Sequence, residues 1–178
     1  MQRRSSRPKK DECYRLIDSA LSKKEELLDA LRDYTVSEHG FEEEDYDYLG
    51  EESLVLEIEN ENGESVFIEL SDAFTLYFDG WHNRYGLQEY EFQYLLEDMN
   101  DLLKNRKCAL TLSSNGKWVG SILSDGAITA EDDKDVILHG MFGSAVSDKI
   151  AEQGGALRAV YWDSEQNIMF KFDEEKQN

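Results

Sequence analysis

The chain has only two cysteines and one proline in 178 residues, and it has no long apolar run. Cys13 and Cys108 are too few for a disulfide framework, so we expect two buried thiols in a reducing compartment. The single proline, Pro8, excludes Pro-rich linkers. Without an 18-residue apolar run we expect no membrane span, and no apolar stretch follows the basic N-terminus as it would in a secretory signal. These absences predict a cytoplasmic protein.

Positive charge is missing from a long central stretch. Residues 33–83 contain 16 Asp or Glu residues and no Lys or Arg, although this stretch also holds strand-like apolar patterns. The formal net charge is −20, and five of the 19 basic residues lie in residues 1–10. Since a folded region of one charge repels itself, a cationic partner is the first function to consider. We expect the basic tail, residues 1–10, to be a solvated arm near the acidic face, although such a tail could also touch nucleic acid or a membrane.

Apolar residues make up 40% of the chain and aromatic residues 11%, which separates it from a disordered acidic tail. The length suits a single domain, for which we assign residues 11–172. The acidic end, residues 173–178, is expected to fray.

The first half of the chain predicts one helix and three strands. Leucines and isoleucines at three- and four-residue spacing predict a helix over residues 11–32, followed by an acidic loop over residues 38–52. Alternation predicts strands around residues 54–59, 66–70 and 74–78. A three-residue turn with Gly63 in a left-handed conformation would place Ile58 opposite Val66. In that register Leu56, Ile58, Ile68 and Leu70 are buried, whereas Glu57, Glu59 and Glu69 point outward with Val55 and Phe67.

The second half predicts a helix from about residue 87 to 105 and a hairpin of residues 108–113 and 117–123 around Asn115-Gly116. Residues 125–140 are polar and ambiguous. A short helix over residues 144–153 should end at Gly154-Gly155, and a last hairpin should join residues 157–162 to 167–172. The predicted fold class is α+β, a mainly antiparallel sheet of hairpins with the N-terminal and central helices packed on one face.

No motif for catalysis or for metal binding is present. His39, His82 and His139 are far apart and lack neighbouring ligands at metal-binding spacing, so we interpret them as ordinary histidines. Ser144 lacks the second glycine of a nucleophile elbow, and the acids at residues 125–133 miss the spacing of a calcium loop. We therefore predict no catalytic residue, no metal ligand and no cofactor. A metal or carboxylate site assembled wholly by the fold stays open as an alternative, which would make the protein an enzyme.

The stretch from Phe74 to Tyr85, with Trp81-His82 after a strand, is the most distinctive part of the sequence. Together with Trp118 in the segment Gly116–Gly120, it resembles small acidic α+β proteins of bacteria, some of which are immunity proteins that neutralise toxins encoded beside them. The resemblance covers about residues 74–123 and supplies no catalytic residues. Trp81 could equally be a core aromatic residue that closes the end of the sheet.

We therefore expect a non-enzymatic acidic inhibitor that binds and blocks a basic protein surface, as an immunity protein blocks a toxin such as a nuclease. One alternative is an anti-defence protein, anti-CRISPR or anti-restriction, whose carboxylates imitate a phosphate backbone; direct nucleic-acid binding is disfavoured by charge. The sequence leaves the oligomeric state open. The predicted partner-binding residues are Glu42, Glu43, Glu44, Asp45, Tyr46, Asp47, Tyr48, Glu57, Glu59, Phe67, Glu69 and Trp81.

Overall fold

The computed structural model describes residues 15–173, which divide into two compact units. The first unit comprises the described residues up to Ile58, Phe67–Leu76 and Asn83–Glu97. The second comprises Glu59–Val66, Tyr77–His82 and the described residues from Asp98 on. None of the described helices is long and apolar enough to cross a membrane. The fold class is α+β, as the sequence predicted, but the strands form two antiparallel sheets where the sequence predicted one.

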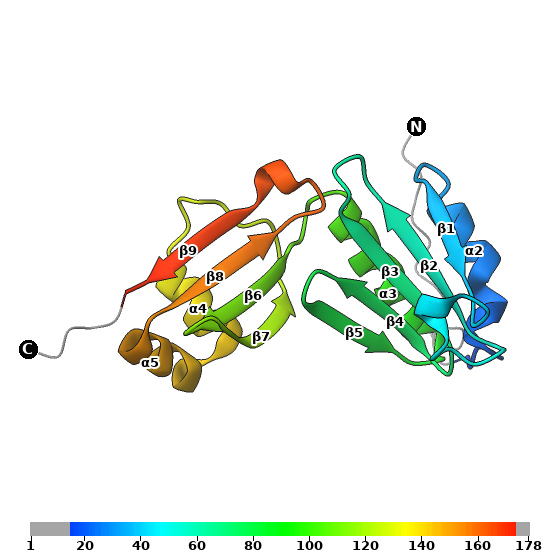
Figure 1. Cartoon of the computed structure of the whole chain (residues 1–178), viewed down its shortest axis with the longest axis horizontal. Coiled ribbons are helices and arrows are strands. Elements are labelled where there is room, and N and C mark those ends of the chain that lie inside the picture. Colours follow the sequence, from blue (N-terminus) through cyan, green and yellow to red (C-terminus); the bar gives the residue numbers. More distant parts are fainter. Residues whose placement is uncertain (1–14, 174–178) are drawn as a thin grey trace, which may run out of the picture. The chain divides into compact units, whose positions relative to one another are not determined.

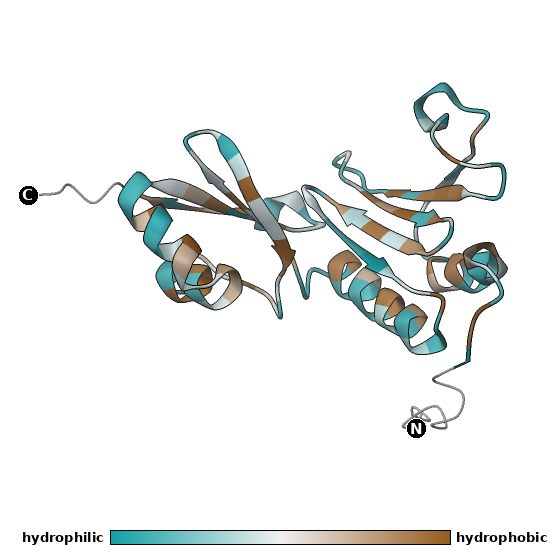
Figure 2. Ribbon diagram, turned by 90° about the horizontal axis from the view of Figure 1, so that it is seen from below, coloured by the Kyte–Doolittle hydropathy of each residue, from teal (hydrophilic) through white to brown (hydrophobic). Residues whose placement is uncertain are grey.

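A five-stranded sheet has the order β1-β2-β3-β4-β5 (Figure 1). Its strands are β1 (Val36–His39), β2 (Leu54–Glu59), β3 (Ser65–Leu70), β4 (Phe74–Phe78) and β5 (Trp81–Tyr85). Strand β1 runs antiparallel to β2, with Val36 opposite Ile58 and His39 opposite Val55. The helices α2 (Lys24–Ala30) and α3 (Glu89–Leu103) lie on one face of this sheet (Figure 2).

Three predictions about the helices and strands of this half of the chain need correction. The N-terminal helix does not include residues 15–19; it starts with the 3₁₀ helix η1 (Ala20–Lys23), and residues 11–14 lie outside the described part. Residues 15–17 instead run alongside residues 87–89, where the Ile17 N–H donates to the Leu87 carbonyl at 2.8 Å. Strand β1 occupies the start of the predicted loop, and β5 lies where no strand was predicted. Strand β5 was not predicted because its sequence is mostly polar: only its first and last residues are buried.

The turn between β2 and β3 is the predicted one. The Asn60 N–H donates to the Glu64 carbonyl at 3.0 Å, and Gly63 has φ of 80°. Leu56, Ile58, Ile68 and Leu70 are completely buried. The prediction that Val55 points outward to solvent is wrong, because Val55 is 3% exposed. It pairs with His39 on β1, from which the chain continues into the loop that leads to β2.

A four-stranded sheet has the order β7-β6-β8-β9. Its strands are β6 (Ala109–Ser114), β7 (Lys117–Leu123), β8 (Gly155–Val160) and β9 (Ile168–Phe172), all paired antiparallel. The helices α4 (Lys134–Phe142) and α5 (Ser144–Gln153) lie on one face of it (Figure 2). Leu138 of α4 and Ile150 of α5 pack there against Leu110, Leu112 and Leu157 of the strands.

Several local predictions for this half are confirmed. Asn115 and Gly116 both have positive φ, 51° and 70°, and join β6 to β7. Helix α5 covers the predicted residues and ends at Gly154, whose φ is 71°. The Cys108 thiol is completely buried, and this burial raises its pKa; Cys13 lies outside the described residues. Helix α4 was not predicted within the ambiguous segment of residues 125–140.

Candidate binding surface

The loop between β1 and β2, residues 40–53, is the most acidic part of the described structure, and we call it the acidic loop. It is built from successive turns: the N–H groups of Glu43, Tyr46 and Leu49 donate to the carbonyls of Gly40, Glu43 and Tyr46 at 3.1, 2.9 and 3.0 Å. Buried Leu49 fixes the loop to the protein. The polar residues of these turns therefore stay at the surface while one apolar residue anchors them.

All seven acids of the acidic loop are exposed. Among the described residues only one of them, Glu43, forms an ion pair, with His39. Six have no ion-pair partner anywhere in residues 15–173: Glu42, Glu44, Asp45, Asp47, Glu51 and Glu52. Unpaired carboxylates this close together repel one another, and a nearby cation would relieve that repulsion.

His39, the last residue of β1, organises the base of the acidic loop. Its Nδ1 lies 2.8 Å from Glu43 Oε2, and its Nε2 lies 3.0 Å from Glu57 Oε2 on β2. The ring also stacks on Tyr46, with centroids 4.6 Å apart and an interplanar angle of 9°. The hydrogen bond that His39 donates to Glu43, and then the one that it donates to Glu57, raise the pKa of His39 although partial burial opposes them. The same contact with His39, together with the Gly40 N–H, lowers the pKa of Glu43.

Aromatic rings stand among these acids. Tyr46 and Tyr48 have ring centroids 6.4 Å apart. Tyr48 is 66% exposed and Phe41 is 40% exposed. Burial, followed by the negative charge of Glu69, raises the pKa of Tyr48, and burial followed by Glu57 raises that of Tyr46. Both phenols therefore stay neutral at ordinary pH and offer apolar faces beside carboxylates.

The structure brings together only part of the predicted set of binding residues. Glu43, Tyr46 and Glu57 meet at His39, and Tyr48 adjoins Tyr46. Glu69, on β3, accepts a hydrogen bond from the Ser71 hydroxyl at 2.9 Å, and Phe67 on the same strand is half-buried.

Glu59 and Trp81 belong to the second unit. Glu59 is exposed, whereas Trp81 is only 7% exposed. The buried indole is the geometry of a core aromatic residue, so we do not include Trp81 in the binding surface.

Sequence reasoning missed four residues of this surface: His39, Phe41, Glu51 and Glu52. His39 was interpreted as an ordinary histidine because no Cys or His lies near it in the sequence. Its four-residue spacing to Glu43 was the available signal, while the contact with Glu57 depends on the pairing of β1 with β2.

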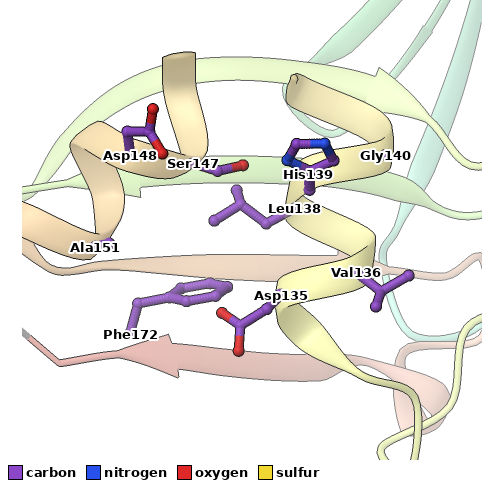
Figure 3. Close-up of a pocket in the computed structure, with 9 residues that line it drawn as sticks. All are labelled: Asp135, Val136, Leu138, His139, Gly140, Ser147, Asp148, Ala151 and Phe172. Carbon is purple, nitrogen blue, oxygen red and sulfur yellow. The ribbon is translucent and has the colours of Figure 1, made fainter. Parts of the chain in front are cut away.

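The second unit contains a groove of about 540 Å³ between α4, α5 and β9 (Figure 3). Leu138, Phe172 and Val136 supply apolar surface, and Asp135, Ser147, Asp148 and His139 stand around them. The Ser147 hydroxyl donates to the Gly143 carbonyl, four residues earlier, at 3.0 Å, a common local contact of serine in a helix. No hydrogen bond joins Ser147 to His139 among the described residues, so the groove lacks the nucleophile–base contact of a hydrolase.

Another polar cluster of the second unit surrounds Asp79. One carboxylate oxygen accepts from Arg158 Nη2 at 2.6 Å, and the other accepts from the Thr111 hydroxyl at 3.0 Å. Thr111 also contacts the Ser121 hydroxyl at 3.1 Å, which accepts from the Trp118 indole N–H at 2.9 Å. Because both oxygens of Asp79 are occupied, this cluster is suited to holding the turn at Asp79 in place rather than to proton transfer.

Within residues 15–173, no group of three or more His, Cys, Asp or Glu side chains is arranged to hold a metal ion. The chain matches no protein-family model, and neither the curated proteins nor the solved structures give a significant match. The acidic loop with its exposed rings is therefore our candidate binding surface.

Proposed function

We propose that the chain is a non-enzymatic inhibitor that binds a basic surface of another protein through the acidic loop. One observation supports this proposal above the others. Within fourteen residues the loop exposes six carboxylates without ion-pair partners in the described chain, together with the rings of Phe41 and Tyr48. Clustered charge speeds the encounter with an oppositely charged protein, and partly exposed aromatic rings are typical anchors of protein interfaces.

We further propose that the partner is a toxin such as a nuclease, that the chain acts on it in the cytoplasm, and that the chain serves as an immunity protein. A nuclease must present cations to bind phosphates, and those cations are the natural complement of the acidic loop. The same chemistry would suit the nucleic-acid channel of a CRISPR or restriction nuclease. The identity of the captured nuclease separates these two roles.

The test is co-purification from the native host with three forms of the full chain. The loop variant carries Glu42→Gln, Glu44→Gln, Asp47→Asn and Tyr48→Ala. The matched control removes the same charge and one exposed tyrosine elsewhere, through Glu97→Gln, Glu131→Gln, Glu152→Gln and Tyr94→Ala. Wild type and control should retain the same cationic protein and suppress its nuclease activity. The loop variant should bind at least about thirtyfold more weakly, since loss of an anchor residue typically costs about 2 kcal/mol or more.

Equal loss of binding in the control would show that bulk charge, not the acidic loop, is responsible. Recovery of no cationic protein by the wild type would contradict the proposed function.

A further inference from the structure

Both ring nitrogens of His39 have a carboxylate oxygen within hydrogen-bonding distance, Glu43 Oε2 at Nδ1 and Glu57 Oε2 at Nε2. A neutral imidazole has a single N–H, so it can donate to only one of these carboxylates and would turn a lone pair toward the other. Only the imidazolium ion donates to both. The geometry therefore selects the protonated ring.

The two contacts join different parts of the first unit. Glu57 lies on β2 and is held by the strand ladder, where it pairs with Ser37 of β1. Glu43 lies in the acidic loop, and its other oxygen accepts the Gly40 N–H at 3.1 Å, which closes the first turn of the loop. The stacking of the ring on Tyr46 adds a contact to the middle of the loop. His39 thus connects the acidic loop to the sheet at two points.

We propose that His39 is a proton-dependent latch, whose imidazolium fastens the acidic loop to β2 and whose loss of the proton releases the loop at Glu43. Release occurs at Glu43 because its side chain is 48% exposed and can turn into water, whereas that of Glu57 is 25% exposed and lies on a strand. The neutral ring keeps one N–H, which stays on Glu57.

The surroundings of the ring contain no competing cation among the described residues. The groups that face it are Glu43 from the loop, Glu57 from β2 and the phenol of Tyr46. Glu38, its charged neighbour on β1, is engaged by Lys24 Nζ of α2 at 2.5 Å. Within residues 15–173, the proton on His39 is therefore the one positive charge that holds Glu43.

The pH range of the latch follows from the two pKa shifts. The pKa of His39 is raised above its ordinary 6.5, so the stabilisation is complete below that pH and is lost as pH rises through the folded-state pKa. The pKa of Glu43 is lowered from 4.5, so the same contact is also lost when pH falls through that lower pKa. The loop is held most firmly in mildly acidic solution.

A regulatory consequence rests on the proposed function. Loss of the proton removes one positive charge from the surface and frees the carboxylate of Glu43. A cationic partner should then associate faster, because electrostatic steering depends on the net charge of the surface. His39→Gln should abolish this pH dependence of the association rate.

The latch itself is tested on the free full-length chain by an NMR titration from pH 4 to 9. The ring signals of His39 give its protonation, and the amide exchange of Gly40 and Glu43, corrected for the intrinsic rate, gives the order of the loop. We expect these amides to lose protection in step with the titration of His39. Glu43→Gln should lower the pKa of His39 and abolish the loss of protection above neutral pH. The control Glu42→Gln, which removes a charge one residue away, should leave both nearly unchanged.

Loop amides that stay protected while His39 loses its proton would overturn the proposal. So would equal pKa changes in the two variants. The wild-type titration decides the question even if a variant does not fold. No partner is needed, so failure of the latch leaves the proposed function standing, and the absence of a nuclease partner leaves the latch standing.

Discussion

At the scale of single residues, Tyr161 ties the core of the second unit to the segment that precedes α4. Its ring is 2% exposed, its hydroxyl donates to the Ile128 carbonyl at 2.8 Å, and it accepts from the Ile128 N–H at 2.5 Å. Burial raises the pKa of Tyr161 to about 12. Tyr161→Phe would leave both backbone groups of Ile128 without this hydroxyl, so we expect the free energy of unfolding in urea to fall by about 1–3 kcal/mol.

The matched control is Tyr48→Phe, which removes the same atom from a ring that is 66% exposed. This change should alter stability by less than about 0.5 kcal/mol. If the two variants were equally stable, water would have replaced both contacts of the Tyr161 hydroxyl. The burial of this hydroxyl would then contribute nothing to the free energy of unfolding.

Residue roles were the hardest features to predict from the sequence. The density of carboxylates at residues 42–52 was visible, and the structure leaves all of them exposed. The role of His39 was not visible, because Glu57 reaches it only through strand pairing over 18 residues of sequence. Trp81 was distinctive in the sequence, but its indole is buried in the structure. A tryptophan of the core and a tryptophan that anchors an interface cannot be told apart from the sequence.

At the scale of elements, the hairpin of β6 and β7 depends on its two-residue turn. Asn115 and Gly116 both lie in the left-handed region, with φ of 51° and 70°. Gly116→Ala would place a Cβ atom in a conformation that costs L-residues about 1–2 kcal/mol, so we expect a loss of that size in thermal or urea unfolding. Gly126→Ala is the control, since Gly126 has no positive φ and a Cβ atom there would meet no atom within 4 Å. Equal effects of the two changes would exclude turn strain as the cause.

Elements with local signals were predictable, and elements without them were not. The turn at Asn115-Gly116 and the end of α5 at Gly154 both need positive φ, and Asn and Gly are the residue types that adopt it most readily. Strand β5 lacks alternation, because its three central residues are exposed and only Trp81 and Tyr85 are buried. In α4 the sequence has apolar residues at adjacent positions, Val136, Ile137 and Leu138, so no single stripe identified a helix. Strand β5 and helix α4 therefore depend on tertiary packing, which the local sequence pattern does not reveal.

At the scale of the whole molecule, charge opposes the fold. The formal net charge is −20, and ten ion-pair contacts are formed among the described residues, most of them partly exposed and individually weak. Pairs such as Lys107–Asp98, at 2.7 Å, offset only part of the repulsion. The acidity therefore destabilises the free chain, and it is consistent with the proposed use of that charge in attracting a cationic partner.

Salt should consequently act in opposite directions on the free chain and on its complex. Raising sodium chloride from about 10 mM to about 1 M shortens the screening length from about 30 Å to about 3 Å. Self-repulsion then weakens, so the Tm of the free chain should rise. The rise should be smaller in the control variant with Glu97→Gln, Glu131→Gln, Glu152→Gln and Tyr94→Ala, because that variant carries less negative charge. The same salt should raise the Kd of the complex with the captured protein, because it screens the attraction as well. A Tm that falls with salt would mean that the ion pairs outweigh the repulsion, and a Kd that does not change would mean that the acidic loop does not act through its charge.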